Sequence, residues 1–384
     1  MKRVDMIFAI LVMAMAGCGV NRQAGSDDFI TVDVSDNYSI KRELMLQDFA
    51  DVEYIALDSN EGFINQGLVQ DIGKEFVVVN SKIDDGNIFV FDRTGRAIRK
   101  INRKGQGNEE YSNVVGITLD EENNEMYVNN HLARKIMVYD LLGNFKRRLK
   151  PEESNDAFYT DMLNYDKDQL ICFSKTNVNG EFVLISKQDG RITQKIKFPM
   201  VEKSSLRMSD SDDEENPGFF RQIIPYNGNW LLSEHSSDTV YTLMPDYTLR
   251  PSIARIPPIL SMNPEVFLVL RFFTNRYYFM ETFYNDYDYD SETSGFPTTP
   301  LMYDKRTKTF CEYNVYNGDF STKKEVYFNS IWHVNREIAS WQPLEPTRLV
   351  ENYKKGELKG KLKDIAATLN EKSNPVIMLL KHKK

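Results

Sequence analysis

The chain contains two copies of one pattern, at residues 87–95 and 135–143. Each copy is a strand-like segment of alternating character that ends in an Asp-x-x-Gly turn, and a basic segment follows each turn. The turn glycines, Gly95 and Gly143, lie 48 residues apart. One four-stranded blade of a β-propeller takes about 40 to 50 residues, so this spacing predicts consecutive propeller blades.

The same organisation extends over most of the chain. Each unit begins with an apolar segment, expected at the crowded centre of a ring, and continues with an alternating segment that ends in a turn. Five complete units are present, at residues 68–101, 114–149, 159–198, 219–256 and 268–316. A propeller can form a single domain at a length of 384 residues.

A sixth unit lacks its outer half. Residues 330–341 form another apolar segment, but apolar residues at helical spacing between positions 358 and 369 predict that a helix follows it. Asn374-Pro375 is expected to end this helix, because proline cannot continue the backbone hydrogen bonding. Residues 376–380 then form a last strand.

Strand-like segments at residues 29–34 and 52–57 supply partners for that last strand. We expect both segments to complete the sixth blade, because closing the ring leaves no open sheet edge. The predicted fold class is therefore all-β: a six-bladed β-propeller closed by N- and C-terminal strands, with one C-terminal helix inserted in the last blade. Five or seven blades are alternatives. An open β-sandwich is another, but it explains neither the period nor the split unit.

The N-terminus has the pattern of a targeting signal. A basic start at Lys2 and Arg3 precedes a run of ten apolar residues, which is too short for the roughly twenty needed to span a bilayer. Small residues then lead to Cys18, as in bacterial lipoprotein signals, although Asp5 and Met15 depart from that pattern. An ordinary secretory signal or a short membrane anchor is the alternative.

The predicted domains follow from this assignment. Residues 1–17 form a lipoprotein signal peptide, residues 18–28 the lipidated Cys18 and a flexible tether, and residues 29–384 the propeller. The predicted location is the bacterial cell envelope, lipid-anchored and most simply at the outer membrane, with the periplasmic or surface side left open. The other two cysteines, Cys172 and Cys311, are expected to be buried free thiols. The formal charge of −8 argues against a nucleic-acid partner, which would need a basic surface.

One linker carries a resemblance to known proteins. Residues 105–111, Gly-Gln-Gly-Asn-Glu-Glu-Tyr, resemble the NHL-type repeat of six-bladed propellers. Together with the Tyr-Ile-Ala-Leu of residues 54–57 and the Asn-Pro-Val of residues 374–376, they are similar to the six-bladed propeller lipoproteins of anaerobic gut bacteria. The resemblance covers residues 29–381 and departs at Asn108, where that family often has proline. It implies the propeller fold and, by analogy, glycan capture or another envelope role.

The expected ligand site is the face formed by the loops between second and third strands and by the linkers between blades. Any one of the residues expected there has an alternative role as a solvated loop residue or as an inter-blade hydrogen-bonding group. The candidates are the polar and aromatic residues Lys82, Arg103, Asn129, His131, Arg134, Glu234, His235, Tyr284 and Trp341.

The glycine-rich linker itself is expected to be structural. Gly105 and Gly107 permit a tight linker, and Glu110 and Tyr111 would tie neighbouring blades together. The Gly-x-Gly pair leads into a β repeat rather than a helix, which excludes a dinucleotide-binding interpretation.

Metal and enzyme signatures are weak in the sequence. The alternating aspartates of residues 286–290 resemble part of a calcium loop, but Ser291 and Pro297 occupy positions where an EF-hand needs glycine and a bidentate acid. No cofactor is therefore expected, with calcium or another divalent ion as the alternative. HExxH, Gly-x-Ser-x-Gly and Gly-Lys-Ser/Thr motifs are absent from the sequence.

The predicted function is a non-catalytic binding or scaffold protein of the envelope. Its partner would be a glycan, a peptide or an outer-membrane protein, and the membrane would be contacted through the lipid anchor only. The alternative is a metal-dependent propeller hydrolase or lyase, in which His131, His235, Glu234 and Asp84 would collect a metal.

Overall fold

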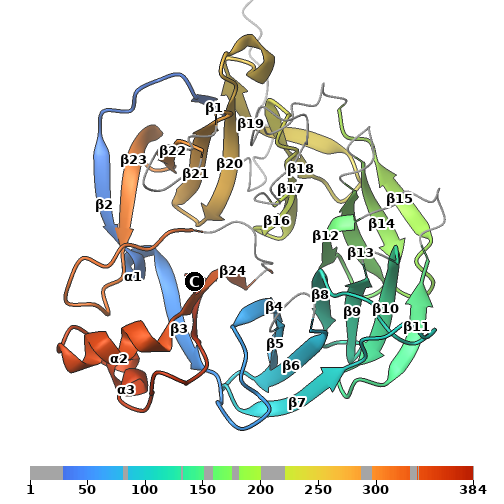
Figure 1. The fold of residues 1–384 in the computed structure, drawn as a ribbon. Helices are drawn as coiled ribbons and strands as arrows, with labels where there is room; N and C mark the ends of the chain where they lie inside the picture. Colours follow the sequence, from blue (N-terminus) through green and yellow to red (C-terminus); the bar gives the residue numbers. More distant parts are fainter. Residues whose placement is uncertain are drawn as a thin grey trace, which may run out of the picture.

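A computed structural model describes residues 29–80, 85–130, 133–150, 159–174, 181–199, 221–286, 296–328, 335 and 337–383. Its strands form six sheets arranged in a ring around a central axis (Figure 1). The predicted six-bladed β-propeller is therefore confirmed. The core lies between neighbouring sheets, because the strands near the axis are buried on both faces; Val77, Val78 and Val79, for example, are completely buried.

Blades one to three are regular four-stranded antiparallel sheets, with the first strand nearest the axis. Their edges coincide with the predicted units. Blade one contains β4 (Leu68–Ile72), β5 (Phe76–Asn80), β6 (Asn87–Asp92) and β7 (Ala97–Asn102). Blade two contains β8 (Gly116–Asp120), β9 (Glu125–Asn130), β10 (Lys135–Asp140) and β11 (Phe145–Leu149). Blade three contains β12 (Tyr159–Asn164), β13 (Gln169–Ser174), β14 (Phe182–Ser186) and β15 (Ile192–Ile196).

Blades four and five each gain an N-terminal strand at the outer edge. The strand β1 (Ile30–Asp33) pairs parallel to β19, and β2 (Lys41–Met45) pairs parallel to β23. Blade four contains β16 (Ile223–Tyr226), β17 (Asn229–Leu232), β18 (Thr239–Leu243) and β19 (Leu249–Ile256). Blade five contains β20 (Val266–Phe273), β21 (Tyr277–Tyr284), β22 (Thr298–Asp304) and β23 (Thr309–Tyr316).

The sixth blade joins the two ends of the chain, as expected. The described part of it contains β24 (Ile338–Leu344), β25 (Val376–His382) and the N-terminal β3 (Ala50–Ala56), in that order. The expectation that the strand at residues 29–34 would lie in this same blade was wrong. It forms β1 on blade four instead, where its apolar side chains Ile30 and Val32 enter the core and its backbone covers an otherwise open edge.

The insertion between β24 and β25 contains two helices rather than the single predicted one. These are α2 (Pro346–Lys354) and α3 (Gly360–Ala366). They are separated at Gly356, whose positive φ of 72° is favourable for glycine and ends the first helix. Leu362 and Ala366 of α3 are buried in the core, in accordance with the helical spacing of the sequence.

Two short helical segments complete the described chain. The helix α1 (Leu46–Phe49) links β2 to β3, and a 3₁₀ turn, η1 (Ile259–Ser261), lies between blades four and five. None of the described helices has the length and apolar character needed to cross a bilayer. Cys172 and Cys311 are buried free thiols, as expected.

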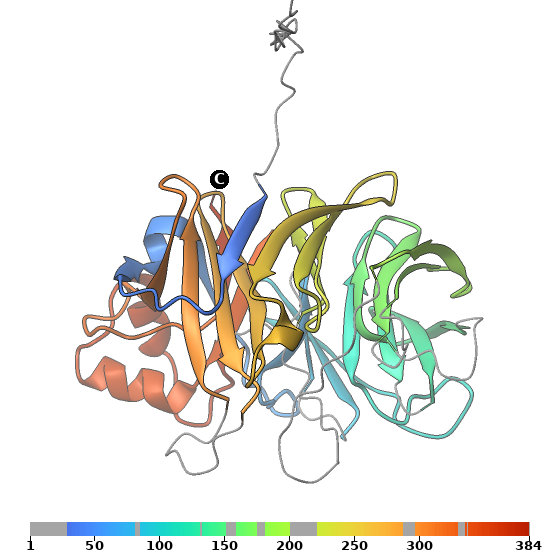
Figure 2. The ribbon, with the colours of Figure 1, turned by 90° about the horizontal axis from the view of Figure 1, so that it is seen from above.

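The ring has two distinct faces. The turns between first and second strands and between third and fourth strands lie on one side, which we call the turn face. The second-to-third loops and the inter-blade linkers lie on the other side, the loop face. Seen from the side, the start of β1 and the end of β25 lie towards the turn face (Figure 2).

Candidate functional site

A cleft of about 510 Å³ opens on the turn face beside the first three blades. We call it the turn-face cleft. Its walls come mainly from the ends of the first strands β4, β8 and β12 and from the turns that follow them. The residues that line it include Asp71, Gly73, Lys74, Glu75, Asp120, Glu121, Glu122, Asn164, Tyr165, Asp166, Lys167, Lys187, Trp230 and Glu337.

Asp71 provides a carboxylate deep in this cleft. Its Oδ2 accepts a hydrogen bond from the backbone N–H of Leu119 at 2.8 Å, and its Oδ1 accepts one from the N–H of Ile72 at 2.8 Å. Within the described residues, no cationic side chain forms an ion pair with it. Burial raises the pKa of Asp71 to about 7, and the two hydrogen bonds offset only part of that effect.

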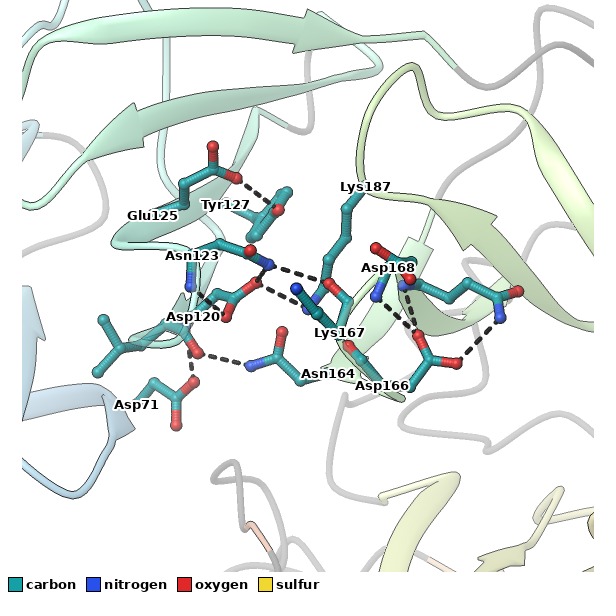
Figure 3. A network of polar contacts seen from close by, with 12 residues as sticks. Asp71, Asp120, Asn123, Glu125, Tyr127, Asn164, Asp166, Lys167, Asp168 and Lys187 are labelled. Atoms are coloured by element: carbon teal, nitrogen blue, oxygen red, sulfur yellow. Dashed lines mark hydrogen bonds and ion pairs between the residues drawn. The ribbon is translucent and has the colours of Figure 1, made fainter.

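Asn164 lies beside Asp71 and bonds to the same residue of β8. Its Nδ2 donates to the carbonyl oxygen of Leu119 at 2.6 Å (Figure 3). Its Oδ1 is buried and has no hydrogen-bond partner among the residues that the structure describes. The backbone N–H and carbonyl of Leu119 therefore hold an aspartate from blade one and an asparagine from blade three next to each other.

A buried ion pair fixes the wall of the cleft between blades two and three. Nζ of Lys187 lies 2.7 Å from Oδ2 of Asp120, and only 6% and 5% of the two side chains are exposed. Lys187 also donates to the carbonyl oxygen of Asp166 at 2.7 Å. Asn123 completes the group by donating to the Asp120 carboxylate at 2.8 Å (Figure 3). These charges are matched within the protein, so they shape the cleft rather than offer a free charge.

Glu121 fixes the turn of the neighbouring blade. Its carboxylate accepts hydrogen bonds from the backbone N–H groups of residues 74, 75 and 76 at 2.7 to 2.9 Å. Gly73 makes this contact possible, because a Cβ atom there would lie 2.2 Å from the Glu121 Oε1. The acid therefore acts as a clamp between blades one and two.

An aromatic pair and a charged rim complete the cleft. The rings of Tyr165 and Trp230 stack with centroids 5.7 Å apart and an interplanar angle of 22°. Seven acidic side chains line the cleft against three lysines, so its potential is negative. The exposed acids at the rim are Glu75, Glu122, Asp166 and Glu337.

None of the described residues predicted to bind ligand lines this cleft. Two of them make inter-blade hydrogen bonds instead: Nδ2 of Asn129 donates to the carbonyl of Tyr159 at 2.8 Å, and Nε of Arg103 donates to the carbonyl of Gly143 at 3.1 Å. Arg134 occupies a turn with a positive φ of 50°. Lys82, His131, Asp84 and Cys18 lie outside the described residues.

The remaining candidates differ in their accessibility. Glu234 and His235 are brought together, with Oε1 and Nδ1 3.1 Å apart, but both side chains are buried. Tyr284 is 39% exposed, whereas Trp341 is only 2% exposed and packs in the core of the sixth blade. The ring of Trp341 therefore offers almost no surface to a ligand.

The glycine-rich linker forms a tie between blades one and two. The hydroxyl of the fully buried Tyr111 donates to the carbonyl of Gly86 at 2.7 Å and accepts from the N–H of Arg103 at 3.0 Å. Glu110 accepts a hydrogen bond from the N–H of Gly107 at 2.8 Å. Its carboxylate also fills the space beside Gly105, where a Cβ atom would lie 1.8 Å from Oε2.

No group of three or more His, Cys, Asp or Glu side chains with the geometry of a metal site occurs in the described ranges. Of the alternating aspartates, Asp286 is described, whereas Asp288 and Asp290 fall outside those ranges. The calcium alternative therefore stays a prediction.

Sequence reasoning placed the site on the loop face and missed the turn-face cleft. A signal was present, because the first strands of blades one to three carry Asp71, Asp120 and Asn164 near their ends. Polar residues near the end of an otherwise apolar inner strand indicate that polar side chains line the mouth of the central channel. The pairing of Asp120 with Lys187, 67 positions away, has no such signal.

Comparison with known proteins adds a family and a set of related structures. The model of a domain of unknown function (DUF4934) matches residues 29–254. No curated protein matches the chain.

Two solved structures from Bacteroides resemble the chain over most of its length. A Bacteroides fragilis protein described as exported is 16% identical, with a TM-score of 0.59, and the match covers 92% of this chain and 99% of that one. A member of the duf4221 family from Bacteroides vulgatus is 9% identical, with a TM-score of 0.50 and coverage of 87% and 96%. At these identities the similarity concerns the fold alone, and it confirms the propeller part of the expected resemblance.

An enzyme is found at greater distance. The virginiamycin B lyase of Staphylococcus aureus is 11% identical, with a TM-score of 0.38, and the match covers 69% of this chain and 88% of the lyase. Similarity at this level carries no argument about chemistry.

Proposed function

The chain belongs to the family defined by a domain of unknown function (DUF4934), and we propose that within it the protein acts as a non-catalytic ligand-binding protein of the bacterial cell envelope. The turn-face cleft is its binding site. This proposal rests on one observation above all: the cleft is a concave space of about 510 Å³ with polar groups that the fold holds in fixed positions. Ligand pockets typically have volumes of roughly 300 to 1,000 Å³.

The arrangement of charge favours binding over catalysis. Lys187 and Asp120 neutralise each other, and Glu121 is occupied by three backbone N–H groups. A nucleophile or general base needs a reactive group next to a positioning partner, and these groups are already engaged in holding blades together. A ligand in the cleft would meet the oxygen acceptors of Asp71 and Asn164 and the stacked rings of Tyr165 and Trp230.

The envelope location rests on the N-terminal sequence and on the exported relative. We propose that Cys18 carries a lipid after cleavage of residues 1–17. The start of β1 lies towards the turn face (Figure 2), and a fully extended tether of residues 19–28 would keep that start within about 35 Å of the membrane surface. The cleft would then face ligands at or near the membrane.

A binding screen on the chain from Ser26 onward tests the proposal. Glycans, peptides and small polar metabolites are screened with and without divalent ions, and hits are repeated with Asn164→Leu. We expect at least one ligand whose affinity falls about tenfold in this variant, because it loses both polar groups of Asn164. The matched control Glu351→Gln alters an exposed acid of α2 away from the cleft and should bind normally.

The opposite outcomes are equally clear. Ligands that bind both variants equally would place the site elsewhere, with the loop face as the first alternative. If a hit were turned over only in the presence of a divalent ion, the protein would instead be a metal-dependent hydrolase or lyase.

A further inference from the structure

The carboxylate of Asp71 has no ion-pair partner among the residues that the structure describes. An ionised carboxylate has about four lone-pair sites, and two of them accept the backbone N–H groups of Ile72 and Leu119. Its side chain is only partly exposed, so solvent replaces such an ion pair incompletely. Burying an unpaired charge is costly, so such a group usually has a partner that neutralises it.

Asn164 places a second acceptor beside the first. Its Nδ2 donates a hydrogen bond to the carbonyl of Leu119, and its buried Oδ1 has no hydrogen-bond partner in the described part of the chain. Asp71 and Asn164 thus flank one residue, and both line the cleft (Figure 3). The lone pairs that remain on these two side chains are complementary to a group that brings only donors.

The charges around the two acceptors are mostly negative. The rim acids Glu75, Glu122 and Glu337 are exposed and line the cleft. Of the lining lysines, Lys187 is neutralised by Asp120, and the other two are exposed on the rim. A negative potential in a low-dielectric cleft concentrates cations and disfavours anions.

We propose that the ligand of the turn-face cleft carries a primary ammonium group, which Asp71 and Asn164 bind at the base of the cleft. An ammonium has three N–H donors and no acceptor, which matches two oxygen acceptors and supplies the missing counter-charge. The inference rests on the proposed binding function and specifies the class of ligand. The volume of the cleft suits a small amine, an amino sugar or one basic side chain of a peptide.

Calorimetric titration of the full chain with putrescine and with 1,4-butanediol tests this directly. The two probes have nearly the same shape, and only putrescine carries ammonium groups. We expect putrescine to bind and 1,4-butanediol to bind at least tenfold more weakly. Glucosamine and lysinamide, each compared with its fully N-acetylated form, then separate a sugar source from a peptide source.

Variants locate the binding to the named residues. Asp71→Asn should weaken putrescine binding at least tenfold, whereas Glu351→Gln, an exposed acid outside the cleft, should leave it unchanged. Should Asp71→Asn fail to fold, the double rim variant Glu75→Gln/Glu337→Gln provides the second test. It should weaken putrescine by about two- to fivefold at low salt, because exposed charges act through the long-range field.

Several results would overturn the proposal. Equal binding of putrescine and 1,4-butanediol, or unchanged binding by Asp71→Asn, excludes ammonium recognition by Asp71. Binding of calcium with no binding of putrescine assigns the oxygen atoms to a metal ion instead. A neutral ligand from the screen that is lost in Asn164→Leu, with no binding of any amine, would sink this inference but leave the proposed binding function in place.

Discussion

Lys187 of the third blade lies 2.7 Å from Asp120 of the second, and almost no solvent reaches either side chain. Each charge is tolerated because the other is there. Replacing one partner leaves an uncompensated buried charge, which typically costs 3 to 5 kcal/mol, whereas replacing both often costs much less. The pair therefore makes a test of how the second and third blades are held together.

We predict that Lys187→Met lowers the free energy of unfolding by about 4 kcal/mol. The double variant Lys187→Met/Asp120→Asn should recover at least half of that loss, because it no longer buries a lone carboxylate. Urea denaturation followed by circular dichroism measures both. Equal stability of the single and double variants would show that the lysine acts through packing or its bond to Asp166 rather than through charge.

The inter-blade tie at Tyr111 leads to a second stability prediction. Tyr111→Phe leaves the carbonyl of Gly86 and the N–H of Arg103 without their partner, so it should cost about 1 to 3 kcal/mol. Tyr327→Phe is the matched control, since Tyr327 is 70% exposed, and it should change stability by less than about 0.5 kcal/mol. Thermal unfolding of both variants decides the matter; similar melting temperatures would contradict a structural role for the Tyr111 hydroxyl.

The repeat predicted the architecture because a propeller blade is a local unit. Strand lengths, turns and the burial of inner strands all follow from residues within about 50 positions of one another. The placement of β1 on blade four could not be inferred in this way. Its alternating Ile30 and Val32 require a buried face, but several blade edges offer one, and the choice depends on distant packing.

The candidate site was harder to predict than the fold. Sequence motifs pointed to loops, where ligand contacts are common, while the turn-face cleft is built from the ends of inner strands in three different blades. Asp71, Leu119 and Asn164 meet only because the ring brings these blades together. Pairwise contacts across 45 to 48 positions have no local sequence signature, so the grouping of these three residues is visible only in the structure.

The environment of Asp71 predicts a pH-dependent stability. Its folded-state pKa of about 7 is above the value of 3.8 expected for an exposed aspartate, so the folded protein binds a proton more tightly than the unfolded chain. The fold therefore loses stability at Asp71 as the pH rises through this range. The unfolding free energy of Asp71→Asn minus that of the unsubstituted protein should therefore rise by on the order of 3 kcal/mol between pH 4 and pH 8.

Chemical denaturation at pH 4, 6 and 8 measures this shift. Using the change with pH, rather than a single value, removes any constant cost of placing an asparagine amide next to backbone N–H groups. A difference that does not vary with pH would mean that Asp71 is ionised with little penalty. Addition of an amine that binds at pH 8 should reduce the stability difference between Asp71→Asn and the unsubstituted protein, because an ammonium stabilises the ionised carboxylate.

The proposed lipid attachment at Cys18 predicts a specific change in where the protein is found. In bacteria that express the full chain, Cys18→Ser should abolish incorporation of an alkyne-labelled fatty acid and move the protein from the membrane fraction to the soluble fraction. Cys172→Ser, at a buried thiol within β13, is the matched control and should retain the label. Retention of the label by Cys18→Ser would rule out that cysteine as the anchor, and loss of the label with continued membrane association would indicate a protein partner that holds the propeller at the membrane.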